Sequence, residues 1–206
     1  MDRVPGNPTV VVLGGAGGMG RVAVATAAAF GDIGELVVAD RDFSAAESIV
    51  LECASLSKTR MRAVSVDVTD DRILVPLLSQ ADVVVNTTGP FFRLGIPVLR
   101  ATIEAGCHYI DICDDWEPTL DMLALDAEAR SRGVLAVIGM GASPGLSNLL
   151  ARIACERLER VEDLYTAWPV DGGSSEVGEE DFSLDDETTD GASAAIQHWM
   201  QQISGN

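Results

Sequence analysis

The sequence predicts an α/β fold with a doubly wound parallel sheet, and three observations lead to this prediction. A short apolar run, residues 10–13, ends directly in a glycine-rich turn. Similar short apolar runs recur over residues 1–160, and most are followed by a stretch with helical periodicity. Apolar runs of this length, without polar residues, are typical of strands that are buried between helices on both faces. Strands that alternate with helices form parallel sheets, because each helix carries the chain back to the start of the next strand.

The turn after residues 10–13 has three glycines at the spacing of a dinucleotide-binding loop. Gly15 is expected to make the turn, Gly17 to let the backbone approach a pyrophosphate, and Gly20 to let the following helix lie close against the strand. A purely structural glycine turn is the alternative, but the strand before it and the alanine-rich helix after it are the context that the binding motif requires. We therefore expect a Rossmann domain. The expected cofactor contacts in this loop are Gly15, Ala16, Gly17, Gly18, Met19 and Gly20.

The end of the second expected strand, residues 35–39, indicates which cofactor binds. Asp40 follows this strand, twenty residues after Gly20, and an acid at that place can bind a ribose 2′-hydroxyl. Arg41 could instead stack over the adenine or pair with a 2′-phosphate. We expect NAD, with NADP as the alternative.

The elements that follow continue the alternation. Ser44 is expected to cap a helix over residues 44–56, with Glu47 completing a capping box. A strand over 61–66, a short helix over 70–78 and a strand over 81–85 come next. Ligands of open α/β sheets bind at the carboxyl ends of the strands. The further cofactor contacts expected on this ground are Asp67, Val68, Thr87, Thr88, Gly89 and Pro90.

The second half of the first domain repeats this pattern. We expect a helix over residues 94–105 closed by Gly106, a strand over 108–112, a helix over 118–130, a strand over 134–138 and a helix over 144–158. Ser143 and Pro144 are expected to be the N-cap and the first residue of that last helix. Six strands in two mononucleotide-binding halves predict the strand order 3-2-1-4-5-6.

Past residue 160 the pattern changes. A strand is expected over 164–170, and residues 171–190 hold nine acids and no base, which favours a solvated, flexible loop. Apolar residues then follow at helical spacing, namely Ala192, Ala195, Ile196, Trp199, Met200 and Ile203. We expect residues 161–206 to begin a second, α+β substrate or dimerisation domain that this chain does not complete. Alternatively, the helix covers the first domain or mediates homo-oligomer formation.

Composition narrows the classes of partner. The formal net charge of -18 disfavours nucleic acid, which is bound mainly through Lys and Arg. No segment is long and apolar enough to span a membrane, and no signal peptide is present, so a cytoplasmic protein with a small-molecule substrate is expected. The four cysteines form no C-x-x-C pair, which favours reduced thiols and no metal site.

Four stretches together resemble the saccharopine dehydrogenase-like family of nicotinamide-dependent oxidoreductases. They are residues 14–20, 83–91, 109–111 and 139–148, and the resemblance covers about residues 8–160. It implies an NAD(P)-dependent amino dehydrogenase or reductase that moves a hydride at a carbon–nitrogen bond of an amino-acid or polyamine-like substrate. It also implies that a second α+β domain holds the substrate. Members of the family continue well beyond this length, so this chain alone is expected to bind a dinucleotide without turning over substrate.

One residue is a candidate for catalysis. Asp114 lies on the loop expected after the fifth strand, where it could orient or deprotonate an amine; an exposed loop acid without such a role is the alternative. His108, His198 and Cys113 are expected to be structural or solvent-facing. The Tyr-x-x-x-Lys pair of short-chain dehydrogenases is absent. The competing function is a non-catalytic dinucleotide-binding or interaction module, because the glycine loop fits both.

Overall fold

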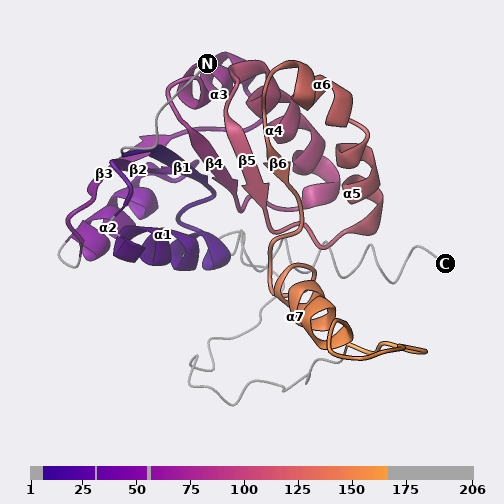
Figure 1. Cartoon of the computed structure of the whole chain (residues 1–206). Helices are drawn as coiled ribbons and strands as arrows, with labels where there is room; N and C mark the ends of the chain where they lie inside the picture. The colour runs from indigo at the N-terminus through magenta and orange to yellow at the C-terminus, as the bar shows by residue number, and fades with distance from the viewer. Residues whose placement is uncertain (1–6, 31, 55–56, 167–206) are drawn as a thin grey trace, which may run out of the picture.

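The structure is a computed structural model, and it describes residues 7–30, 32–54 and 57–166. One six-stranded sheet has the order β3-β2-β1-β4-β5-β6, and all its neighbouring strands are parallel (Figure 1). The predicted Rossmann strand order is therefore confirmed. The elements in chain order are β1 (Thr9–Leu13), α1 (Gly18–Phe30), β2 (Glu35–Asp40), α2 (Phe43–Ala54), β3 (Arg60–Ser65), α3 (Asp71–Leu78), β4 (Val83–Asn86), α4 (Phe91–Ala105), β5 (His108–Asp111), α5 (Trp116–Leu123), α6 (Asp126–Ser131), β6 (Ala136–Val137) and α7 (Leu146–Cys155).

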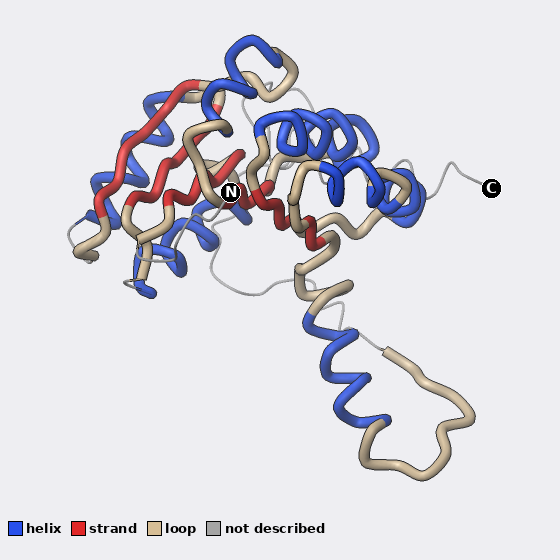
Figure 2. The backbone as a smooth tube through the Cα atoms, turned by 45° about the horizontal axis from the view of Figure 1, so that its top comes forward, coloured by secondary structure: helices blue, strands red, loops and turns tan. Residues whose placement is uncertain are grey.

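Strand β1 lies at the centre of the sheet and is buried on both faces. Val10 and Val12 pack with residues of α1 and α2 on one face, whereas Val11 and Leu13 pack with residues of α3 and α4 on the other. Successive side chains of a strand point to opposite faces, so a continuous apolar run is what a central strand between two helical layers requires. The two layers flank the sheet in Figures 1 and 2.

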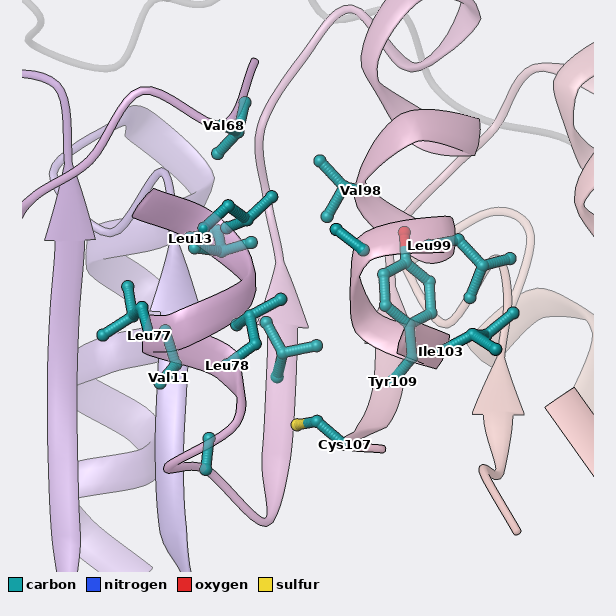
Figure 3. Close-up of a cluster of buried hydrophobic side chains, with 14 of the residues drawn as sticks. Val11, Leu13, Val68, Leu77, Leu78, Val98, Leu99, Ile103, Cys107 and Tyr109 are labelled. Atoms are coloured by element: carbon teal, nitrogen blue, oxygen red, sulfur yellow. The ribbon is translucent and has the colours of Figure 1, made fainter. Parts of the chain in front are cut away.

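The larger core lies between the sheet and α3 to α6. Figure 3 shows Leu77 and Leu78 from α3 on one side of this cluster and Leu99 and Ile103 from α4 on the other, next to the ring of Tyr109. Each of these side chains is at least nine-tenths buried. At about 25 cal/mol per Å² of apolar surface, this burial is the main force that holds α4 on the sheet.

Helix α2 begins one residue earlier than expected and has a different cap. Asp42 precedes the helix, and its Oδ1 accepts a hydrogen bond of 3.0 Å from the amide of Ala45. The predicted N-cap, Ser44, lies inside the helix, where its carbonyl accepts the Ser48 hydroxyl. Asp and Ser cap helices about equally well, so the pattern of types alone did not decide between them.

Other boundaries also differ from the expected ones. Helix α4 begins at Phe91, directly after Pro90, and ends as predicted at Gly106, which has the left-handed φ of 74°. The helix expected over 118–130 is two helices, and the buried Leu125 lies between them. Strand β6 has only two residues. Helix α7 begins at Leu146 rather than Pro144, after Gly145 at a φ of 107° that residues with a side chain rarely adopt.

Helix α7 extends away from the sheet and from the other helices (Figures 1 and 2). It has no buried residue, and Leu146, Leu149, Leu150 and Ile153 are each more than half exposed. The expected strand over 164–170 is not formed at residues 164–166, and its remainder is outside the described residues. The acidic stretch 171–190 and the helix expected from residue 192 also lie outside them. None of the described helices is long and apolar enough to cross a bilayer.

The start of α1 lies directly against the turn that precedes it. A Cβ atom on Gly20 would overlap the carbonyl oxygen of Gly14 and lie 2.8 Å from the Cα of Gly15. Both of these are backbone atoms, which cannot turn aside as a side chain could. By contrast, a Cβ on Gly18 would meet no atom within 4 Å. Close packing of helix and turn therefore depends on Gly20.

These two glycines form a matched pair for measurement. We expect Gly20→Ala to lower the free energy of unfolding by about 3 kcal/mol, the upper end for overpacking, because the backbone must shift. Gly18→Ala is expected to leave stability unchanged or to raise it by about 0.5 kcal/mol through higher helix propensity. Urea unfolding followed by circular dichroism measures both. Equal stability of the two variants would contradict the packing argument.

Candidate dinucleotide-binding site

The site residues predicted from the sequence lie at one edge of the sheet. Because all neighbouring strands are parallel, the loops that follow β1, β2, β3, β4 and β5 leave the sheet at the same edge. The structure thus brings together along this edge Gly15, Ala16, Gly17, Gly18, Met19, Gly20, Asp40, Arg41, Asp67, Val68, Thr87, Thr88, Gly89, Pro90 and Asp114.

Individual glycines of the turn have structural roles that differ from the predicted ones. Gly14, not Gly15, has the left-handed φ of 70° that makes the turn. A Cβ on Gly15 would lie 2.7 Å from Cγ1 of Val38, so Gly15 is required for packing against β2. Gly17 and Gly18 are exposed, and the nearest atom to a Cβ on Gly17 is the Gly14 carbonyl oxygen at 3.3 Å. The surface above Gly17 and Gly18 is therefore open to a ligand.

The first turn of α1 suits a phosphate. The first amides of a helix have no acceptor within the helix and carry the positive end of its dipole. No acidic side chain lies in this turn, so none repels an anion there. The Gly17 amide is used by the turn itself, since it donates to the Gly14 carbonyl at 3.0 Å. The amides that begin the helix, from Gly18 onward, are therefore the candidates for binding a phosphate.

Asp40 connects the end of β2 to the glycine turn. Its Oδ2 accepts a hydrogen bond of 3.0 Å from the amide of Ala16, and its Oδ1 accepts one of 3.2 Å from the amide of Asp42. Sequence reasoning expected this carboxylate to bind a ribose but did not predict that it holds the turn. A carboxylate accepts about four hydrogen bonds, so the ribose assignment stays a prediction beside this second role. Arg41 is exposed next to it.

The loop after β4 is fastened to the loop after β1. The Thr87 hydroxyl donates to the Leu13 carbonyl at 2.7 Å, and the Thr87 amide donates to the same carbonyl at 3.0 Å. The amide and hydroxyl of Thr88 both donate to Oδ1 of Asn86, at 3.0 and 2.6 Å. Gly89 is exposed, and Pro90 directly precedes α4. Thr87 and Thr88 therefore shape the loop, and Gly89 presents its backbone at the edge.

Asp67 and Val68 lie at the same edge after β3 and use their side chains within the protein. The Asp67 carboxylate accepts hydrogen bonds from the hydroxyl and the amide of Thr69, at 2.7 and 2.9 Å. These bonds, the hydroxyl first, hold the pKa of Asp67 below its ordinary value. The Val68 side chain is buried in the core (Figure 3), so its backbone is the part that a cofactor could contact.

A buried polar network lies behind these loops, and sequence reasoning did not assign it. Asn86, Tyr109 and Asp111 are each 2% exposed or less. The Asn86 side-chain amide donates to the Tyr109 hydroxyl at 3.0 Å, and Oδ1 of Asp111 accepts the amides of Cys113 and Gly139. The alternation along β5 was the available signal, because Asp111 follows Tyr109 by two residues and so faces the same side.

In the loop after β5, the catalytic candidate Asp114 and the preceding residue Cys113 differ in their exposure to solvent. Asp114 is exposed, whereas Cys113 is fully buried. Burial raises the pKa of the Cys113 thiol to about 11, which keeps the thiol protonated at neutral pH. Among the described residues, no three His, Cys, Asp or Glu side chains are grouped closely enough to hold a metal ion.

Known proteins share this architecture. The carboxyaminopropylagmatine dehydrogenase of Synechocystis sp. is 25% identical over 152 residues, which are 70% of this chain and 37% of that protein. The apo saccharopine dehydrogenase (L-Glu forming) of Saccharomyces cerevisiae superposes with a TM-score of 0.61 at 22% identity, over 73% of this chain and 31% of that one. A short chain dehydrogenase from Mycobacterium smegmatis gives 0.52 at 19% identity, over 65% of this chain and 75% of that one.

At these identities the two structural likenesses establish the fold alone. The chain spans about a third of the length of the Synechocystis and yeast proteins. The family model described as the saccharopine dehydrogenase NADP binding domain matches residues 10–137, which include β1, the glycine turn and the ends of β2 and β4. The predictions of this family and of a nicotinamide dinucleotide cofactor are thereby confirmed. This chain belongs to the saccharopine dehydrogenase NADP-binding domain family.

Proposed function

We propose that the chain is the cofactor-binding part of an NAD(P)-dependent oxidoreductase. The observation that carries this proposal is the open glycine turn, where Gly17 and Gly18 are exposed above a helix start without acids. The family match and the dehydrogenase name of the Synechocystis relative support it. The substrate we propose is an amino acid or a polyamine-like molecule, and the reaction is hydride transfer at its carbon–nitrogen bond.

Different residues at the carboxyl edge would bind different parts of the cofactor. The turn and the first amides of α1 would hold the pyrophosphate, and Asp40 would bind the adenine ribose. The loops after β4 and β5 would lie under the nicotinamide, which supplies the hydride acceptor or donor when bound. A cytoplasmic location and self-association through residues 192–203 also stay predictions.

A substitution at Gly17 tests the cofactor site. We expect Gly17→Val to weaken NAD(P)H binding by roughly 100-fold or more, because the side chain would occupy the place of the pyrophosphate. The fold should remain, because the φ of Gly17 lies outside the left-handed region and a Cβ there, 3.3 Å from the Gly14 carbonyl oxygen, needs only a small shift of the turn. Ala25→Val, on the exposed face of α1, is the matched control. Isothermal titration calorimetry measures both, and unchanged affinity in Gly17→Val would refute the assignment of the turn.

The choice between the two cofactors depends on Asp40. We expect NADH to bind more tightly than NADPH at the same salt concentration, because the carboxylate repels a 2′-phosphate. Asp40→Asn keeps an oxygen that can accept the Ala16 amide but removes the charge, so it should reduce the difference. Asp42→Asn, a change at an exposed neighbouring acid, is the control. Tighter NADPH binding by the unchanged protein would reverse the preference and point to Arg41.

Asp114 is the proposed catalytic residue. In a longer protein that includes the substrate-binding part, we expect Asp114→Asn to lower kcat with an amine substrate by about 100-fold, the lower range for loss of a general base, and to leave the Kd for NAD(P)H unchanged. Glu117→Gln, an exposed acid in the first turn of α5, is the control. The assay follows NAD(P)H with a panel of amino acids, secondary amines and imines. Full activity of Asp114→Asn would remove it from the mechanism.

The same panel separates the two classes of function. Cofactor binding together with turnover of a panel member supports the oxidoreductase. Cofactor binding without turnover, by a protein that includes the substrate-binding part, supports a non-catalytic dinucleotide-binding module.

A further inference from the structure

Asp111 is an acid in a place where acids are rarely found. It is the last residue of β5, in register with Asn86 on β4, and none of its surface is exposed. Burial raises the pKa of its carboxyl, and the hydrogen bonds from Gly139, Cys113 and the Tyr109 side chain oppose that change only in part. A buried polar group costs free energy unless hydrogen bonds compensate for the lost water. The hydrogen-bond partners of the Asp111 carboxyl therefore indicate its role.

The carboxyl of Asp111 joins two loops that are far apart in sequence. Its Oδ1 accepts the amide of Gly139, after β6, at 2.7 Å and the amide of Cys113, after β5, at 3.0 Å. Its backbone carbonyl accepts the amide of Met140 at 2.7 Å. Strand β6 has only two residues in register with β5, so these bonds extend the attachment where the ladder ends.

The loop after β4 is held by the adjacent part of the network. Asn86 donates to the Tyr109 hydroxyl and accepts both donors of Thr88, so it connects this loop to β5. The Tyr109 ring packs beside Leu99 and Ile103 of α4 (Figure 3). Burial, followed by the charge of Asp111, raises the pKa of Tyr109, so the phenol stays protonated. Asn86, Tyr109 and Asp111 thus fix three neighbouring loops from below.

These three loops follow β4, β5 and β6, on the opposite side of β1 from Asp40. In a doubly wound sheet each half binds one mononucleotide of the cofactor, and the crossing point is the central strand. If the adenosine half lies over β1 to β3, the nicotinamide half lies over β4 to β6. We propose that Asp111 is a positioning residue that sets the loops beneath the nicotinamide half without touching the cofactor. This inference rests on the proposed NAD(P)-binding function.

The experiment compares a whole cofactor with the same molecule lacking nicotinamide. The probes are NADH and ADP-ribose, or NADPH and 2′-phospho-ADP-ribose, whichever pair the unchanged protein binds more tightly. We expect Asp111→Ala to weaken binding of the whole cofactor by about 10-fold and binding of the truncated one by less than about twofold. Asp111→Asn should restore cofactor affinity to within about threefold, because the amide oxygen still accepts the two loop amides.

Thr102→Val is the matched control. Thr102 is also fully buried, but its hydroxyl donates to the Val98 carbonyl within α4 rather than to a backbone group of the three loops. The Thr102→Val variant should have a lower free energy of unfolding but unchanged affinities for the whole and the truncated cofactor. If Asp111→Ala does not fold, Tyr109→Phe replaces it, since this variant removes the bond to Asn86 and keeps the ring. A loss of about threefold confined to the whole cofactor is then expected.

The outcomes separate the inference from the function on which it rests. Equal weakening of both probes by Asp111→Ala, or none, would overturn the positioning role, as would failure of Asp111→Asn to restore binding. A protein that binds ADP-ribose as tightly as NADH would overturn it as well, because nicotinamide would then contribute nothing. An unchanged protein that binds none of the four probes would overturn both the inference and the proposed function.

Discussion

The close contact between Gly20 and the backbone of Gly14 determines the geometry of the whole edge. Because no Cβ intervenes, α1 starts within backbone contact of the turn, and its first amides, which have no acceptor within the helix, lie next to the exposed Gly17. The same turn is closed from the other side by Thr87, since a Cβ on Gly14 would lie 3.2 Å from the Thr87 backbone and hydroxyl. The helix, the turn and the loop after β4 therefore fit together only as one unit.

Side chains that accept or donate to backbone groups complete this unit along the sheet. Asp40 holds the turn from β2, Thr87 holds the end of β1 from the loop after β4, and Asp111 holds the loops after β5 and β6. Each bond contributes only about 1 kcal/mol to stability, but each fixes backbone that would otherwise lose more entropy when a ligand binds. A site made of loops can thus be rigid without a regular structure of its own.

The strand order and the position of the site at the carboxyl ends of the strands could be predicted from the sequence. Both follow from apolar runs and glycine spacing, which are local patterns. Sequence reasoning did not identify Asp111, because its importance comes from partners such as Gly139, 28 residues away, that no local pattern connects to it. The cap of α2 was placed at Ser44 rather than Asp42 because both types cap helices. The break at Leu125 was missed because no Gly or Pro marks it in the sequence.

Asp40 has a consequence for protein engineering. In proteins of this fold the acid that follows the second strand helps to set the preference between NAD and NADP. Here the same carboxylate accepts the amide of Ala16, so its removal would change the ribose site that we propose and also release the glycine turn. A redesign for the phosphorylated cofactor must therefore keep an acceptor at this position, such as Asn or Ser, and introduce the positive charge from a neighbouring residue instead.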